Sequence, residues 1–295
     1  MDRRRVAAFA LLVLSNLLWS GNWVIGRAVR DSFDPIALNF WRWLVAALVM
    51  APFALREALA HRAVIRRHLG LFALLALSGV VAFQSLVYLG LRTTTAINAV
   101  LINAAGPLFM VVCSWMLERD RPSLRQICGM LISFLGVLIV VSHGSLQALL
   151  GLQFHRGDAW ILIAMPMWGV YSVLLKRTPA ELRGVGFAFT IAAIGVAMLS
   201  PLYLADAWSE PFRRPSGAEA GAILYIAIGA SVLAFLAWNR GVAAVGANAA
   251  GFTLPLLPAF GTALAMVFLG EAFQAFHAAG FIIIVAGVVL ATHRR

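Results

Sequence analysis

The sequence is poor in charged residues, and acidic side chains are especially scarce. Only 12% of its 295 residues are charged, and just 12 of them are Asp or Glu. An ordinary soluble domain has about a quarter of its residues charged, so this composition excludes a soluble fold of the usual kind. With 62% hydrophobic residues and a mean hydropathy of +0.90, the chain is predicted to be an all-α integral membrane protein in a lipid bilayer.

Cysteine is almost absent too, and other reactive groups lack partners. Cys113 and Cys128 have no metal-type spacing, which argues against a disulfide framework, a zinc site or any other metal site. No nucleophile and base are paired at membrane depth, so we expect neither an enzyme nor a cofactor. The 23 basic residues form short clusters between apolar runs. Nucleic-acid binders gather them on one face, and we therefore expect no nucleic acid as partner.

Carboxylates are missing from the middle of every apolar run. The acidic residues and the histidines all lie near run ends or in loops. Proton-coupled carriers usually keep an ionisable relay at membrane depth, despite its cost. The sequence therefore predicts facilitated, gradient-driven transport.

Ten apolar runs are long enough to cross about 30 Å of hydrocarbon. They lie near Val6 to Ile25, Ile36 to Leu55, Leu69 to Leu91, Thr94 to Met116, Leu124 to Val141, Ala159 to Leu175, Val185 to Ala205, Ala218 to Trp238, Val245 to Leu269 and Phe276 to Thr292.

The second half of the chain repeats the first. A shift of 151 residues places Gly90 on Gly241 and Pro107 on Pro258, and a shift of 149 places Trp19 on Trp168. Matches at glycines and prolines indicate a shared backbone geometry. Chance similarity of two Ala-rich segments is the alternative. Five helices per repeat is an odd number, which predicts two inverted repeats, 1–145 and 146–295, around a central cavity.

The basic residues test this inversion. With the amino terminus in the cytoplasm, sixteen Lys or Arg residues fall on the inner side and six on the outer side, with Arg42 inside a helix. Cytoplasmic loops carry the excess of positive charge in membrane proteins. Both termini of this multi-pass chain are therefore expected in the cytoplasm.

Uncharged polar and aromatic residues interrupt the apolar runs. Asn16, Trp19 and Trp23 are spaced to share one helix face, and such a face is better turned inward than toward lipid. Amides, hydroxyls and indoles can hold a small zwitterion or an aromatic ring. Each residue alone could equally bond neighbouring helices. The predicted substrate-binding set also includes Asn22, Gln84, Tyr88, Asn98, Asn103, Trp168, Tyr171, Ser172, Trp238, Asn239, Asn248 and Thr253.

Arg42 is the one strongly basic residue inside an apolar run. It could anchor a substrate carboxylate or pair within the bundle, or it could extend its guanidinium toward the outer headgroups. Other tryptophans are assigned to the interfacial belt. These are Trp41, Trp43, Trp115, Trp160 and Trp208.

Prolines mark the fourth run and its repeat. Pro107, Pro255 and Pro258 are predicted inside helices, where each removes a backbone hydrogen bond and permits a kink. Neighbouring small residues allow another helix to approach. We interpret these prolines as hinges between inward and outward states; static curvature is the alternative.

These features resemble the EamA domains of the drug/metabolite transporter superfamily. The resemblance rests on Trp19 before Ser20-Gly21, its counterpart Trp168 before Gly169, the run Phe40-Trp41-Arg42, the central prolines and the Gly129 and Gly280 helices. More narrowly, the chain resembles the YddG branch, bacterial exporters of aromatic amino acids. It departs from the superfamily's pattern at one position. In the second copy, Ile191 stands at the position that corresponds to Arg42.

The resemblance implies a ten-helix exporter of the bacterial inner membrane, with aromatic and other bulky neutral amino acids as substrates. It is expected to act by alternating access, as a monomer. An exporter of organic cations or multiple drugs would share the aromatic lining, but its relatives with four helices carry a membrane glutamate that is absent here. A sugar-phosphate carrier would need several basic residues in the cavity. A membrane scaffold is the alternative outside transport.

Overall fold

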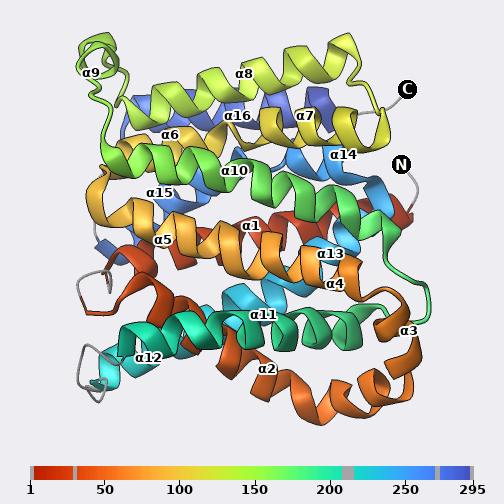
Figure 1. The fold of residues 1–295 in the computed structure, drawn as a ribbon. Coiled ribbons are helices and arrows are strands. Elements are labelled where there is room, and N and C mark those ends of the chain that lie inside the picture. Colours follow the sequence, from red (N-terminus) through yellow and green to blue (C-terminus); the bar gives the residue numbers. More distant parts are fainter. Residues whose placement is uncertain (1–2, 29–31, 208–215, 270–272, 293–295) are drawn as a thin grey trace.

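The computed structural model describes residues 3–28, 32–207, 216–269 and 273–292, and within these ranges all regular secondary structure is helical (Figure 1). The first half contains α1 (Arg3–Ala28), α2 (Pro35–Ala60), α3 (Arg62–Arg67), α4 (Leu69–Ala76), η1 (Leu77–Ala82), α5 (Phe83–Thr93), α6 (Ala96–Ala104), α7 (Gly106–Glu118), α8 (Leu124–Val141) and α9 (Leu146–Leu150). The second half contains α10 (Arg156–Leu174), η2 (Leu175–Arg177), α11 (Gly184–Ala207), α12 (Gly217–Tyr225), η3 (Ile226–Leu233), α13 (Ala234–Val245), α14 (Ala247–Gly251), α15 (Leu256–Leu269) and α16 (Ala275–Thr292).

The described part of the chain contains nine helical stretches that are long and apolar enough to cross a membrane. They match nine of the ten runs expected from the sequence. The tenth run, near Val245 to Leu269, is divided between the short α14 and the 14-residue α15. A turn over residues 252–255 separates the two helices.

The three prolines predicted as hinges lie just before a helix or in its first turn. Pro107 occupies the first turn of α7, where a proline costs no helical hydrogen bond. Pro255 lies in the turn before α15, so its predicted place inside a helix is wrong; only Pro258 is within α15. Proline fits the start of a helix better than its interior, which explains why the chain breaks there instead of kinking.

Helices α8 and α16 lie side by side (Figure 1), and glycines bring their backbones into contact. A Cβ atom added to Gly287 would lie 2.3 Å from the Ser133 nitrogen, and one added to Gly136 would lie 2.7 Å from the Ile284 nitrogen. Small residues allow such close approach between spanning helices. These glycines, which recur in the two halves of the sequence, therefore lie in one contact between α8 and α16.

The end of the molecule opposite the two termini is closed by a buried carboxylate. Asp158, at the start of α10, is 2% exposed. It accepts hydrogen bonds from the Thr94 hydroxyl, from Asn98 Nδ2 at 2.6 Å and from the His155 backbone nitrogen at 2.8 Å. Since Thr94 and Asn98 belong to the first half of the chain, Asp158 ties the two halves together at this end.

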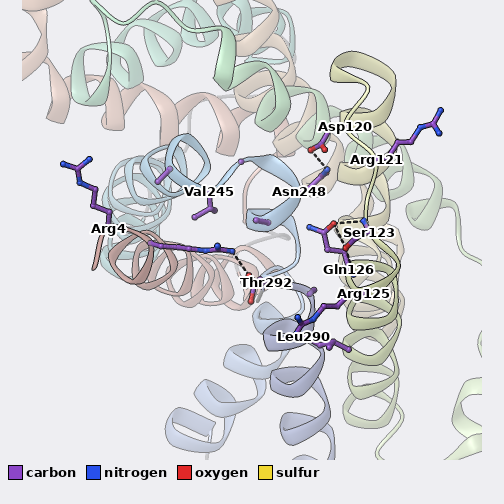
Figure 2. A pocket seen from close by; sticks show the side chains of 15 residues that line it. Arg4, Asp120, Arg121, Ser123, Arg125, Gln126, Val245, Asn248, Leu290 and Thr292 are labelled. Carbon is purple, nitrogen blue, oxygen red and sulfur yellow. Dashed lines mark hydrogen bonds between the residues drawn. The ribbon is translucent and has the colours of Figure 1, made fainter. Parts of the chain in front are cut away.

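The end that carries the termini is hollow. A cavity of about 1340 Å³ lies among α1, α8, α14 and α16, and a second of about 700 Å³ lies among α7, α10, α11 and α13. Asn248 Nδ2 donates to Asp120 Oδ2 at 2.9 Å, and Asp120 borders both cavities. Figure 2 shows Asn248 directed at Asp120 beside the larger cavity. Among the described residues, Asp158 thus joins the halves at one end, called the closed end, and two cavities lie at the other, called the open end.

We expect Gly287→Ala to destabilise the fold by about 1–3 kcal/mol, because its methyl group would overlap the α8 backbone. Thermal unfolding in detergent measures the effect. The control is Gly70→Ala in α4, where no atom lies within 4 Å of the added Cβ. Equal unfolding temperatures for the two variants would contradict the close helix contact.

We expect Asp158→Asn to lower the free energy of unfolding by about 1–3 kcal/mol, because an amide nitrogen cannot accept the bonds that the carboxylate accepts. The matched control is Asp34→Asn at the same end. Asp34 is 30% exposed in an ion pair with Arg92 at 3.4 Å, and exposed pairs contribute at most about 1 kcal/mol. An Asp158 variant no less stable than this control would refute the role of Asp158 in closing this end.

Candidate functional site

A central cavity of about 40 Å³ lies within the bundle, between elements of both halves. Its walls come from α1, α2, η1, α5, α6, α7, α10, η3, α13 and α15, with one residue from the turn before α15. The lining residues are Trp19, Asn22, Trp23, Arg42, Trp43, Gly79, Phe83, Gln84, Asn103, Gly106, Met165, Trp168, Ala230, Phe235, Leu254 and Leu257.

Aromatic rings form one wall of this cavity. Trp19 and Trp168 meet edge to face with their ring centroids 5.1 Å apart, and Phe83 lies 5.0 Å from Trp168. Trp238 packs 5.2 Å from Trp19 behind the lining. Such pairs prefer offset or edge-to-face geometry, which leaves π faces for a further ring. The two repeat-related tryptophans, Trp19 and Trp168, are therefore in direct contact at the cavity.

Arg42 enters the cavity from α2, and only 3% of it is exposed. Its Nε donates to the Ser231 hydroxyl at 2.8 Å, and its Nη1 donates to the Tyr88 hydroxyl at 2.9 Å. The guanidinium also lies 5.5 Å from the Trp43 ring centroid and 5.9 Å from that of Tyr88. The side chain is thus held inside the bundle by two neighbouring elements, η3 and α5, and does not extend toward the headgroups.

In the part of the chain that the structure describes, no carboxylate forms an ion pair with Arg42. Its two hydrogen-bond acceptors are neutral hydroxyls, and the Tyr88 hydroxyl is in turn 3.3 Å from Asn22 Oδ1. A buried charge is costly unless it is paired. The cavity wall is therefore suited to an anionic group of a ligand.

Two π-helical segments, η1 and η3, border the cavity at positions related by the 151-residue shift, so that Gly79 corresponds to Ala230. The Ala230 carbonyl accepts a hydrogen bond from Trp19 Nε1 at 3.0 Å, and the Val80 carbonyl accepts one from Asn39 at 3.0 Å. Segments of π-helix are rare and occur often at functional sites. Periodicity in the sequence gave no sign of them.

Several predicted site residues bond neighbouring helices instead of lining the cavity. Asn16 donates to the Thr253 hydroxyl at 2.9 Å. The Tyr171 hydroxyl donates to Asn239 at 2.7 Å, and Trp238 Nε1 donates to the Ser172 hydroxyl at 3.1 Å. The last two bonds lie between the central cavity and the 700 Å³ cavity, which Ser172 and Asn239 line. They form a partition that separates the two spaces.

Other predicted residues lie at the ends of the molecule. Asn98 bonds Asp158 at the closed end, and Asn248 bonds Asp120 at the open end. Of the predicted set, the structure brings these together at the cavity: Trp19, Asn22, Trp23, Arg42, Gln84, Asn103 and Trp168. Tyr88 does not line the cavity, but its hydroxyl accepts a hydrogen bond from Arg42, which does. Pro107, Pro255 and Pro258 do not line the cavity.

Sequence reasoning missed part of the lining. Trp43, assigned to the interfacial belt, is 2% exposed and borders the cavity, so that assignment is wrong. Its position next to Arg42 was the available signal. Phe83, next to Gln84, and Phe235 were missed because an apolar residue in an apolar helix carries no sign of the direction it faces. Trp208 lies outside the described residues.

Comparisons with known proteins agree on a family. The EamA-like transporter family model matches residues 6–142 and 155–292. An uncharacterized transporter of Archaeoglobus fulgidus is 31% identical over 97% of both chains. The uncharacterized transporter YyaM of Bacillus subtilis is 26% identical over 88% of this chain and 85% of its own. A probable terminal-alkyne amino-acid exporter of Streptantibioticus cattleyicolor is 26% identical over 96% of this chain and 92% of its own.

The fold agrees as well. One crystal structure of a protein superposes with a TM-score of 0.73 at 20% sequence identity, covering 97% of this chain and 96% of that one. At this identity the likeness concerns the fold alone. Together with the family match over nearly the whole length and the apolar helices, it supports a multi-pass membrane protein with a small-molecule substrate. The chain belongs to the EamA-like transporter family and is a transporter, not an enzyme.

Proposed function

We propose that this transporter exports aromatic and other bulky neutral amino acids across the bacterial inner membrane by alternating access, without coupling to protons. Its substrate site is the central cavity, and Arg42 binds the amino acid carboxylate. The aromatic wall of Trp19, Trp23 and Trp168 receives the side chain. Asn22, Gln84 and Asn103 offer amide groups to the rest of the zwitterion.

The observation that carries this proposal is the buried, unbalanced charge of Arg42. An arginine presents several N–H donors in a planar fork that matches a carboxylate. Two of its nitrogens are bonded to hydroxyls of the protein, which fix the guanidinium beside the cavity. A ligand carboxylate would supply the missing negative charge, and an organic cation would meet repulsion. The same charge thus argues against export of cationic drugs.

Two further observations support the substrate class, the first a ring and the second an amino acid. The lining is rich in indole and phenyl groups, which stack with aromatic ligands. One relative is named a probable exporter of amino acids with a terminal alkyne. A volume of about 40 Å³ is too small for any amino acid, since ligand pockets typically measure about 300–1,000 Å³. The cavity must therefore widen during the transport cycle.

The proposed architecture is ten spanning helices in two inverted repeats, 1–145 and 146–295, with both termini in the cytoplasm. Two matches of one family model, at residues 6–142 and 155–292, support the repeat. The excess of Lys and Arg on one side supports the orientation. On that orientation the open end faces the cytoplasm, where an exporter loads its substrate. Pro107, Pro255 and Pro258, at or near helix breaks, stay as candidate hinges, and the proposed unit is a monomer.

Uptake of labelled phenylalanine into liposomes that hold the purified protein tests the substrate class. We expect saturable uptake that unlabelled tryptophan inhibits, while alanine inhibits it weakly and a lipophilic cation does not. A proton-sensitive dye inside the liposomes should record no substrate-dependent flux. Equal inhibition by alanine would refute aromatic selectivity. Inhibition by the cation alone would favour a drug exporter.

The Arg42→Gln variant tests the carboxylate contact. We expect it to lose about 2 kcal/mol or more of binding free energy for phenylalanine, because a charge-assisted pair is lost. It should lose no affinity for phenethylamine, which has the same ring without a carboxylate and whose ammonium group Arg42 repels. Competition binding in detergent measures both ligands, and Arg92→Gln, an exposed arginine at the closed end, is the control. Equal losses for the two ligands would contradict a carboxylate anchor.

A further inference from the structure

We propose that Arg42 also binds a small monovalent inorganic anion of the chloride class when the cavity is contracted, and that a substrate carboxylate displaces this anion. The site is the central cavity, and the anion contacts the guanidinium from the cavity side. The anion site itself does not depend on which substrate is carried. Only the displacement rests on the proposed function.

The first argument is charge. A guanidinium that is 3% exposed inside a membrane protein is far from bulk water and its ions. Within the described residues its acceptors are the Ser231 and Tyr88 hydroxyls, which carry no charge. Removal of a charge from water costs several kcal/mol per ion unless an opposite charge accompanies it. A small anion in the cavity meets this requirement at every stage when no substrate is bound.

The second argument is the set of hydrogen-bond donors. Nε and Nη1 of Arg42 are used by the protein, whereas Nη2 has no acceptor among the described residues. The amide side chains of Asn22, Gln84 and Asn103 also line the cavity, and no carboxylate of the described ranges does. An anion accepts hydrogen bonds and gives none, so a wall with these donors and one positive charge favours an anion over a cation.

The third argument is size. One water needs a space of at least about 10–15 Å³ on the same measure. The cavity, at about 40 Å³, holds a small ion with one or two waters and excludes an aromatic amino acid. The contracted cavity therefore fits an inorganic anion and the widened cavity fits the substrate. Since both ligands use the same guanidinium, they cannot be bound together.

Equilibrium binding of radiolabelled chloride to the full-length protein in detergent tests the site, with gluconate replacing chloride at constant ionic strength. We expect saturable binding of one chloride per chain, together with an unfolding temperature that rises with chloride. Arg42→Gln should abolish both effects. Arg92→Gln should leave both unchanged. No saturable binding, or equal binding by the Arg42→Gln variant, would overturn the proposal.

Two further variants test the anion site if the Arg42→Gln variant does not fold. Ser231→Ala keeps the charge and removes one fixed contact, so chloride should still bind, with up to about tenfold weaker affinity. Arg42→Lys keeps the charge without the planar fork, and saturable binding should persist with lower affinity. If neither variant changes the chloride affinity, the anion lies elsewhere and the assignment to Arg42 is wrong.

Measurements of transport at different chloride concentrations distinguish the anion site from the proposed function. Above its dissociation constant, a tenfold increase in chloride should raise the KM for phenylalanine by up to about tenfold and leave kcat unchanged. If the protein binds chloride but does not transport phenylalanine, the anion site is supported and the proposed substrate class is refuted. Phenylalanine transport that chloride does not affect, in a protein that binds chloride, would refute displacement.

Discussion

The central interaction in this molecule is a positive charge that is buried without a negative partner among the described residues. Arg42 is fixed by Ser231 on η3 and by Tyr88 on α5, so that helices from both halves share one guanidinium. A charge of this kind is tolerated only where its hydrogen bonds are made and where a counterion can reach it. The anionic ligand that we propose for the cavity follows from that requirement.

The scaffold around this charge is rigid in some places and weakly joined in others. Glycines hold α8 against α16 with backbones in contact, and Asp158 holds the closed end with three hydrogen bonds. Near the cavity, by contrast, π-helical segments and short helices replace continuous ones. Helices of this kind leave carbonyl groups free to bond side chains, as Ala230 does with Trp19. Regular packing and irregular backbone thus occupy different parts of the fold.

Much of the fold could be read from the sequence, because hydrophobic length and composition decide whether a helix can span a bilayer. Nine of ten expected runs are helical stretches long and apolar enough to span a membrane in the described residues. Pairs such as Trp19 and Trp168, found by the repeat, do meet in space. The side chain directions could not be read. Trp43 was placed at the interface and Asn98 at the cavity, since neighbours from distant helices decide which face is buried, and the π-helices have no periodic signature.

The hydrogen bond between Asn248 and Asp120 has a consequence for rates. It is the side-chain contact between the two cavities at the open end, and one such bond contributes only about 0.5–1.5 kcal/mol net. That is comparable to thermal energy, so side-chain motion alone can break this bond. The partition of Tyr171, Asn239, Trp238 and Ser172 is buried more deeply and combines two bonds with packed rings. Breaking the bond between Asn248 and Asp120 is therefore expected to be faster than opening this aromatic partition.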